Sequence, residues 1–151
     1  MPRPLTVKIK RLDPANADVP LPAKMSAHAA GFDVCAAVPA PLVIEPGKIA
    51  LIPCGFAMAI PEGYEAQVRP RSGLASKSGV TVVNTPGTID SDYRGEVQVP
   101  MINLGPKNFA VTRGMRIAQM LILPVPRVRM VEVDNLGETR RGRGGFGHTG
   151  H

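Results

Sequence analysis

Short runs of apolar and β-branched residues, separated by turn-forming Gly and Pro, extend along most of the chain. Many short strands bounded by such turn residues are typical of an all-β sandwich or barrel. The predicted strands cover residues 7–11, 42–44, 49–53, 57–60, 66–69, 81–84, 97–103, 109–112, 117–124 and 128–132. The pattern therefore predicts an all-β fold.

Only residues 73–78 have the pattern of a short helix, and Gly79 is placed to end it. The apolar run at 120–125 is nearly continuous, and a strand that is apolar on both faces has to be covered on both. Burial between subunits and a crowded core between two sheets both satisfy this requirement. The pattern leaves these two alternatives open.

Length and composition predict a single domain with an arm. The 151 residues are enough for one domain with a sizeable core, and 44% hydrophobic content excludes a chain disordered throughout. Without Trp and with few aromatics, that core has to be mainly aliphatic. The one compositional break follows Asp134. We expect a β domain over residues 1–135 and a flexible Gly-rich arm over residues 136–151.

Charge and cysteine content indicate which partners and which cellular compartment to expect. The net charge of +6 favours anionic ligands, but no long Lys/Arg block stands beside aromatics, so we expect no nucleic acid partner. No apolar run approaches the roughly 20 residues of a membrane span, and the N-terminal residues lack the apolar core of a signal peptide. Cys35 and Cys54 lie in apolar contexts that predict buried free thiols. We expect a cytoplasmic protein without a membrane partner.

The segment 141–151, RGRGGFGHTGH, combines five glycines with Arg141, Arg143 and Phe146. Glycine loses the most backbone freedom on ordering, so this segment is not expected to form a helix or strand by itself. Free N–H groups, a stacking ring and fixed positive charge suit a nucleotide, over which such an arm can close. A disordered terminus is the alternative.

The segment 88–95 carries two carboxylates, Asp90 and Asp92, between a Pro-Gly turn and a predicted strand. An ionised Asp within reach of a water molecule can orient it and accept its proton. An acidic β-turn without catalytic role explains the same residues, because Asp and Ser are common in turns. The segment alone therefore favours the turn.

Three residues at the start of the predicted helix, Arg71, Ser72 and Gly73, suit an anion. There, free N–H groups, bidentate hydrogen bonds from Arg and close approach at Gly occur together. An ordinary N-cap Ser is the alternative. Asp33 in AGFDV and Gln119 in an apolar strand are weaker candidates, for which a turn and an interior hydrogen-bond partner are ordinary explanations.

Five segments, in this order, resemble the five motifs of the trimeric dUTP pyrophosphatases. They are AGFDVCA at 30–36, PRSGLASKSGV at 70–80, GTIDSDYRGEV at 87–97, RIAQMLI at 116–122 and RGRGGFGHTG at 141–150. The resemblance implies a jelly-roll-like homotrimer with three sites at subunit interfaces. It also implies Mg²⁺-assisted hydrolysis of dUTP to dUMP and pyrophosphate, which clears dUTP from the nucleotide pool and supplies dUMP for thymidylate synthesis.

The resemblance also implies a role for each matching position. Asp90 would orient and deprotonate the water that attacks the α-phosphorus, and it would meet the sugar 3′-hydroxyl. Tyr93 would pack on the deoxyribose and leave no room for a 2′-hydroxyl. Asp33 would hold Mg²⁺ through water. The uracil edge would be read by Asn84 and by the chain around Thr88, Ile89 and Gln98. The phosphates would be bound by Arg71, Ser72, Gly73 and Gln119.

The arm completes the site in this interpretation. Arg141 would clamp the γ-phosphate while Phe146 stacks on the uracil ring. Gly147 and Thr149 would add further contacts. His148 stands where the family often has Ser, so a contact of this residue with the phosphates is not carried over.

Two other functions compete with this one. A dCTP deaminase, or a deaminase with pyrophosphatase activity, shares the fold, but Tyr93 and the GGFG tail fit the pyrophosphatase better. A nucleotide-sensing trimer without catalysis is the second alternative. The presence of Asp90, Arg71 and Arg141 speaks against it.

Overall fold

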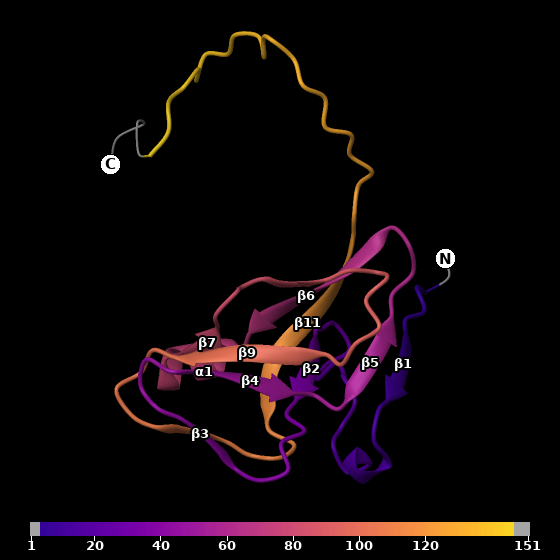
Figure 1. The fold of residues 1–151 in the computed structure, drawn as a ribbon, viewed down its shortest axis with the longest axis vertical. Coiled ribbons are helices and arrows are strands. Elements are labelled where there is room, and N and C mark those ends of the chain that lie inside the picture. Colours follow the sequence, from indigo (N-terminus) through magenta and orange to yellow (C-terminus); the bar gives the residue numbers. More distant parts are fainter. Residues whose placement is uncertain (1–3, 147–151) are drawn as a thin grey trace.

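The computed structural model describes residues 4–146 and is built mainly from strands (Figure 1). The helical elements are η1 (Pro14–Asn16), a 3-10 turn, and α1 (Ser72–Ser78). The strands are β1 (Lys8–Arg11), β2 (Phe32–Cys35), β3 (Leu42–Ile44), β4 (Ile49–Pro53), β5 (Phe56–Ala59), β6 (Tyr64–Pro70), β7 (Val80–Val82), β8 (Gly87–Ile89), β9 (Gln98–Asn103), β10 (Phe109–Val111) and β11 (Arg116–Pro124). The all-β prediction is confirmed.

All strand pairs are antiparallel. One sheet has four strands in the order β2-β11-β6-β8, and another has three in the order β4-β9-β7. The pairs β1-β5 and β10-β3 form two smaller ribbons. The long strand β11 pairs with β2 along one edge and with β6 along the other. Segments far apart in the sequence that carry candidate site residues therefore lie in one sheet.

The core is mainly aliphatic, as the composition predicted. Its largest fully buried side chains include Phe56, Ile44, Ile52, Met101 and Ile117. Such side chains contribute about 1.5–3 kcal/mol each by leaving water. Cys35 and Cys54 are both buried free thiols, which confirms that prediction. Burial raises the pKa of both thiols, so they stay protonated and unreactive at neutral pH.

An arginine fixes the loop between β1 and β2. The guanidinium of Arg113 donates to the Asp18 carboxylate at 2.6 and 2.8 Å and to the carbonyl oxygen of Ala15 at 2.9 Å. This hydrogen-bonded pair holds the pKa of Asp18 below its ordinary value. The loop is thereby tied to the β10–β11 turn, where Arg113 lies.

The predicted helix is present as α1. Gly79 follows it with a φ of 68°, in the left-handed region, and its N–H donates to the Ala75 carbonyl. A Cβ at this position would stand 2.7 Å from the backbone nitrogen of Gly105, so glycine is needed for space as well. Sequence and structure agree on where this helix ends.

The structure differs from the strand predictions at three places. Strands β2 and β8 were not predicted, because each is short and begins beside a Gly that suggests a turn. Their strand character comes from pairing with β11 and β6. The predicted strand at 128–132 is wrong for this chain, because that segment pairs with no strand in the described residues and is exposed throughout.

After β11 the chain leaves the sheets and arcs away from them (Figure 1). Residues 125–146 contain no helix or strand. This is compatible with an arm, but the boundary at residue 135 stays a prediction. Within residues 4–146, no helix is both long enough and apolar enough to cross a bilayer.

Candidate functional site

Asp90 lines a cavity of 270 Å³, which we call the Asp90 cavity. Its lining residues are Leu51, Thr88, Ile89, Asp90, Tyr93, Glu96, Val97 and Gln98. Asp90 directly follows β8, and Gln98 begins β9, so two strand ends and the loop between them form the walls. Four of the residues predicted to contact the nucleoside therefore lie around the predicted base.

Pairing with β6 positions this cavity. Thr88 lies opposite Gln67, and Ile89 lies opposite Ala66, so β8 is held against the four-stranded sheet up to the residue before Asp90. The chain then turns, and the Tyr93 N–H donates to the Asp90 carbonyl at 3.2 Å. The acidic turn therefore forms part of the candidate catalytic site, and Asp90 in it is exposed.

A second cavity, of 260 Å³, is lined by Asp33, and we call it the Asp33 cavity. Its lining residues are Met25, Asp33, Arg71, Ser72, Gly73, Arg116 and Gln119. Asp33 on β2 is the register partner of Gln119 on β11, and α1 begins beside them. The first, second and fourth motifs therefore meet in three dimensions.

Asp33 faces two arginines in this cavity. Arg116 donates from Nη1 to Asp33 Oδ2 at 3.0 Å, and Arg71 Nε lies 3.6 Å from the same oxygen. The Asp33 side chain is only 11% exposed, so this pairing is partly shielded from water. Two guanidinium groups against one carboxylate leave a positive excess, which suits a phosphate chain.

The packing of Gly31 and the start of α1 both shape the Asp33 cavity. Gly31 packs beneath Gln119, because a Cβ there would lie 2.7 Å from the Gln119 Cδ. The N-cap of α1 is Arg71, with no side-chain hydrogen bond to the helix, so Ser72 is the first helical residue rather than the cap. The ordinary N-cap explanation for Ser72 is therefore wrong. The Ser72 hydroxyl does not cap the helix.

The two cavities share no lining residue. Within one chain, the predicted base Asp90 lies with the residues predicted to contact the nucleoside. The predicted metal ligand Asp33 lies with the residues predicted to contact the phosphates, in a different cavity. Asn84 lines neither cavity and lies beside Gly87. Arg141 and Phe146 are exposed on the arm, and Gly147 and Thr149 lie outside the described residues.

Sequence reasoning missed Arg116, Glu96 and Leu51 as cavity residues. Arg116 begins the RIAQMLI segment and was detectable as a charge beside an apolar strand. Glu96 follows Gly95 in the third segment, but its carboxylate contacts Gly55, a partner far away in the sequence. Leu51 is an exposed apolar residue of β4 and carries no chemical signal.

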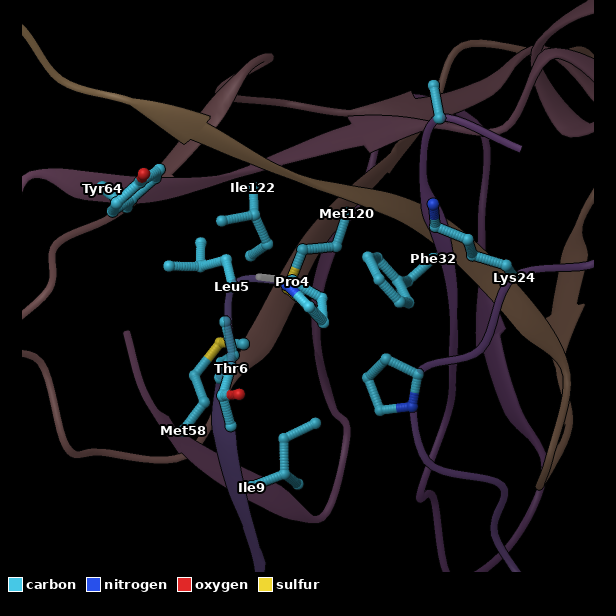
Figure 2. Close-up of a pocket in the computed structure, with 13 residues that line it drawn as sticks. Pro4, Leu5, Thr6, Ile9, Lys24, Phe32, Met58, Tyr64, Met120 and Ile122 are labelled. Carbon is cyan, nitrogen blue, oxygen red and sulfur yellow. The ribbon is translucent and has the colours of Figure 1, made fainter. Parts of the chain in front are cut away.

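A larger cavity of 650 Å³ lies elsewhere, between the N-terminal residues and the edge of the four-stranded sheet. Figure 2 shows its mostly apolar side chains, with Leu5 beside Ile122 and Met58 beside Thr6. None of its lining residues is acidic or belongs to the predicted site. It therefore contributes nothing to the candidate chemistry.

Fold and site together define a small antiparallel β protein in which one cavity is lined by Asp90 and another holds Asp33 between two arginines. Comparison with known proteins then gives the family. The dUTPase family matches residues 17–150, so the chain belongs to the dUTPase family.

Individual relatives agree with this assignment. The deoxyuridine 5′-triphosphate nucleotidohydrolase of Methylocella silvestris is 58% identical, covering 99% of this chain and 94% of its own length. The enzyme of the same name from Caulobacter vibrioides is 56% identical, covering 99% and 97%. The solved dUTPase of Staphylococcus bacteriophage 80alpha with dUPNHPP is 26% identical, with a TM-score of 0.86 and coverage of 97% and 99%. The jelly-roll-like fold expected from the sequence is confirmed by this likeness.

Proposed function

We propose that this chain is a dUTP diphosphatase, which hydrolyses dUTP to dUMP and pyrophosphate. The observation that carries the proposal is the pairing of a carboxylate with nucleoside-contacting residues in one cavity and of arginines with an amide in the other. The family assignment and the names of relatives more than half identical to it support the same substrate.

In the proposed reaction, the Asp90 carboxylate orients a water molecule and accepts one of its protons. The water oxygen bonds to the α-phosphorus, and the bond from that phosphorus to the bridging oxygen of the β-phosphate breaks. Pyrophosphate leaves with the electron pair of that bond, and dUMP remains. One positioned carboxylate is enough for this step, because phosphoryl transfer depends mainly on positioning and charge neutralisation.

The Asp33 cavity is proposed to bind the phosphates. Arg71 would make two charged hydrogen bonds to a phosphate. The backbone N–H groups of Ser72 and Gly73 and the side-chain amide of Gln119 would donate neutral hydrogen bonds. Arg116 orients the Asp33 carboxylate through its 3.0 Å contact. The positive charge of the cavity would thereby stabilise the negative charge that develops on pyrophosphate.

Asp33 fits Mg²⁺ as the proposed cofactor. Its carboxylate is the ligand type this ion prefers, and the ion usually keeps several waters and binds through phosphates, so one protein carboxylate is sufficient. When bound, Mg²⁺ would neutralise phosphate charge in the transition state. The proposed contact is through water, as the resemblance implies.

The Asp90 cavity is proposed to select the nucleoside. The backbone around Thr88, Ile89 and Gln98, with Asn84, would present donors and acceptors to the uracil edge. A mismatched base would leave buried polar groups unpaired, which can cost up to roughly 10⁴–10⁵ in discrimination. Tyr93 would pack on the deoxyribose and exclude a 2′-hydroxyl.

We propose a homotrimer in which each site joins the Asp90 cavity of one copy to the Asp33 cavity of another. Their separation within one chain supports this arrangement. So does an exposed apolar surface on β4, where Ile49 and Leu51 are 58% and 55% exposed. Leu51 also lines the Asp90 cavity, so a neighbour that covers this surface would reach the site.

The arm is proposed to close over the bound nucleotide. Arg141 would clamp the γ-phosphate, and Phe146, with its ring fully exposed in the described structure, would stack on uracil. Gly147 and Thr149 would add contacts. We place the reaction on the free nucleotide pool of the cytoplasm, with neither nucleic acid nor membrane as partner.

A pyrophosphate-release assay across dUTP, dTTP, dCTP and UTP, with and without Mg²⁺, tests the proposal. We expect release from dUTP alone and strong stimulation by Mg²⁺. Ammonia from dCTP would indicate the deaminase instead. Purified protein that leaves dUTP intact in the presence of Mg²⁺ would contradict the proposed function.

A further inference from the structure

The Tyr93 ring forms a wall of the Asp90 cavity although it lies on an exposed loop. The side chain is 46% exposed, and exposed side chains ordinarily exchange between rotamers on the picosecond to nanosecond timescale. Here, two features of the chain directly after it restrict the ring. They concern Gly95 and Glu96, neither of which has a role in the reaction proposed above.

Gly95 lies under the ring. A Cβ at this position would stand 2.6 Å from the Tyr93 Cζ and 3.0 Å from Cε2, and it would be closer still to the hydroxyl oxygen. Its backbone is outside the left-handed region, so conformational freedom is not what requires glycine here. Space for the ring is the requirement, and any side chain would lift the ring away from the loop.

Glu96 holds the hydroxyl group at the same end of the ring. The Tyr93 hydroxyl donates to the Glu96 carbonyl oxygen at 2.9 Å, and the Glu96 carboxylate accepts the Gly55 N–H at 2.9 Å. The next residue, Val97, exchanges backbone hydrogen bonds with the same corner, at Cys54 and Phe56. Both of those residues are buried in the core. The acceptor for the Tyr93 hydroxyl is therefore anchored to the rigid part of the domain.

We propose that Gly95 and Glu96 are positioning residues that set the depth of the Tyr93 ring and thereby exclude a ribose. The inference rests on the proposed function, in which this ring packs on the sugar. Exclusion of one hydroxyl by contact requires the ring to be held within a fraction of an ångström. Neither residue touches the reacting phosphorus, so both act on sugar selection through Tyr93.

Three variants separate the two contacts: Gly95→Ala, Glu96→Ala and Glu96→Gln. The alanine at 95 displaces the ring, and Glu96→Ala removes the acceptor for Gly55, whereas Glu96→Gln keeps an oxygen in that place. Asp92→Ala is the matched control, because it lies in the same loop but does not line the Asp90 cavity. The measurement is kcat/KM for dUTP and for UTP.

We expect Gly95→Ala to lower the dUTP-to-UTP ratio of kcat/KM about tenfold or more, mainly through a higher KM for dUTP. Glu96→Ala lowers the ratio less, and Glu96→Gln restores it. Asp92→Ala leaves it unchanged. A ratio unchanged in both Gly95→Ala and Glu96→Ala would overturn the proposal. If Gly95→Ala does not fold, the comparison of Glu96→Ala with Glu96→Gln decides alone.

A second measurement reports on the ring without nucleotide. The chain has no Trp and two Tyr, so Tyr64→Phe leaves Tyr93 as the only strong fluorophore. We expect iodide to quench its emission more strongly in Gly95→Ala and Glu96→Ala than in Glu96→Gln or Asp92→Ala. Equal quenching in all four would show that the two residues do not hold the ring.

Failure of the proposed function has a different signature. The unmodified chain would then show no preference for dUTP over UTP, whereas failure of this inference leaves that preference intact in every variant.

Discussion

At the scale of single residues, the candidate role of Asp90 follows from its position. It follows the last residue of β8 and lines a cavity together with residues predicted to contact the nucleoside. Asp92, two residues later, does not line that cavity. The Asp90 cavity distinguishes two carboxylates that look equivalent in the sequence, although both also line a wider cavity of 500 Å³.

This separation predicts the outcome of a paired substitution. Asp90→Asn keeps the shape of the side chain and its ability to form hydrogen bonds, but the amide cannot accept the proton of the water. We expect kcat for dUTP to fall by about 10²–10⁴-fold, while the dissociation constant for a non-hydrolysable dUTP analogue stays nearly unchanged. Stopped-assay kinetics and calorimetric titration measure the two quantities.

Asp92→Asn is the control and should retain near-normal turnover. Equal losses in Asp90→Asn and Asp92→Asn would indicate that loop charge, rather than one base, supports the reaction. Near-normal turnover of Asp90→Asn would reject Asp90 as the base.

In the Asp33 cavity, also at the scale of single residues, two positive charges face one negative charge. One carboxylate oxygen is shared between Arg71 and Arg116, so neither arginine is fully neutralised. A triphosphate can replace part of this pairing without leaving a buried charge unpaired, which would otherwise cost several kcal/mol. We therefore expect Arg116 to hold Asp33 while Arg71 binds phosphate.

At the scale of elements, local patterns predicted what local interactions decide. Helix α1 ends at Gly79 because the left-handed cap is a property of that residue and its neighbours. The strands β4, β9 and β11 were predicted within a residue of their observed bounds, because each has a long apolar or alternating run. Elements of this kind need no knowledge of their partners.

The elements that were missed depend on partners. Strand β2 is recognisable only when β11 lies beside it, and β8 only when β6 does. The segment at 128–132 shows the reverse case, since its alternating apolar residues have strand character but pair with nothing in the described chain. Its exposed Val128 and Met130 are 68% and 91% exposed. Strand formation needs a second strand, which a sequence pattern cannot supply.

The candidate site divides in the same way. Asp90, Arg71 and Gln119 were detectable because a short motif surrounds each of them. Glu96 was not, because its carboxylate is paired with Gly55, 41 residues earlier in the chain. Which candidates share a cavity was also beyond the sequence, because it depends on the register of β2 against β11.

At the scale of the whole molecule, we expect the arm and the β domain to have separable tasks. All described strands end by Pro124, and the exposed apolar surface of β4 belongs to the domain. A chain ending at Leu136 should therefore still form trimers, as measured by sedimentation. It should hydrolyse dUTP about 10²-fold more slowly, because the contacts of Arg141 and Phe146 are lost.

Phe146→Ala in the full-length chain is the companion variant, with a smaller loss expected because Arg141 remains. A truncated chain with normal turnover would show that the arm is dispensable. A truncated chain that is monomeric would show that residues after Leu136 belong to the assembly.

The strongest consequence of two separate cavities concerns mixed trimers. Asp90→Asn disables the Asp90 cavity of its own copy, and Arg71→Ala disables the Asp33 cavity of its own copy, so each homotrimer has three defective sites. When the two variants are co-expressed, an interface that takes Asp90 from one variant and Arg71 from the other is intact. A cyclic trimer that contains both variants has one intact interface out of three, so co-purified mixed trimers should regain about a third of the unmodified activity. A site confined to one chain predicts no recovery, because every copy would then carry one lesion. Trimers of Asp90→Asn alone, carrying the same affinity tags, set the baseline, and activity at that baseline in the mixture would contradict sites shared between copies.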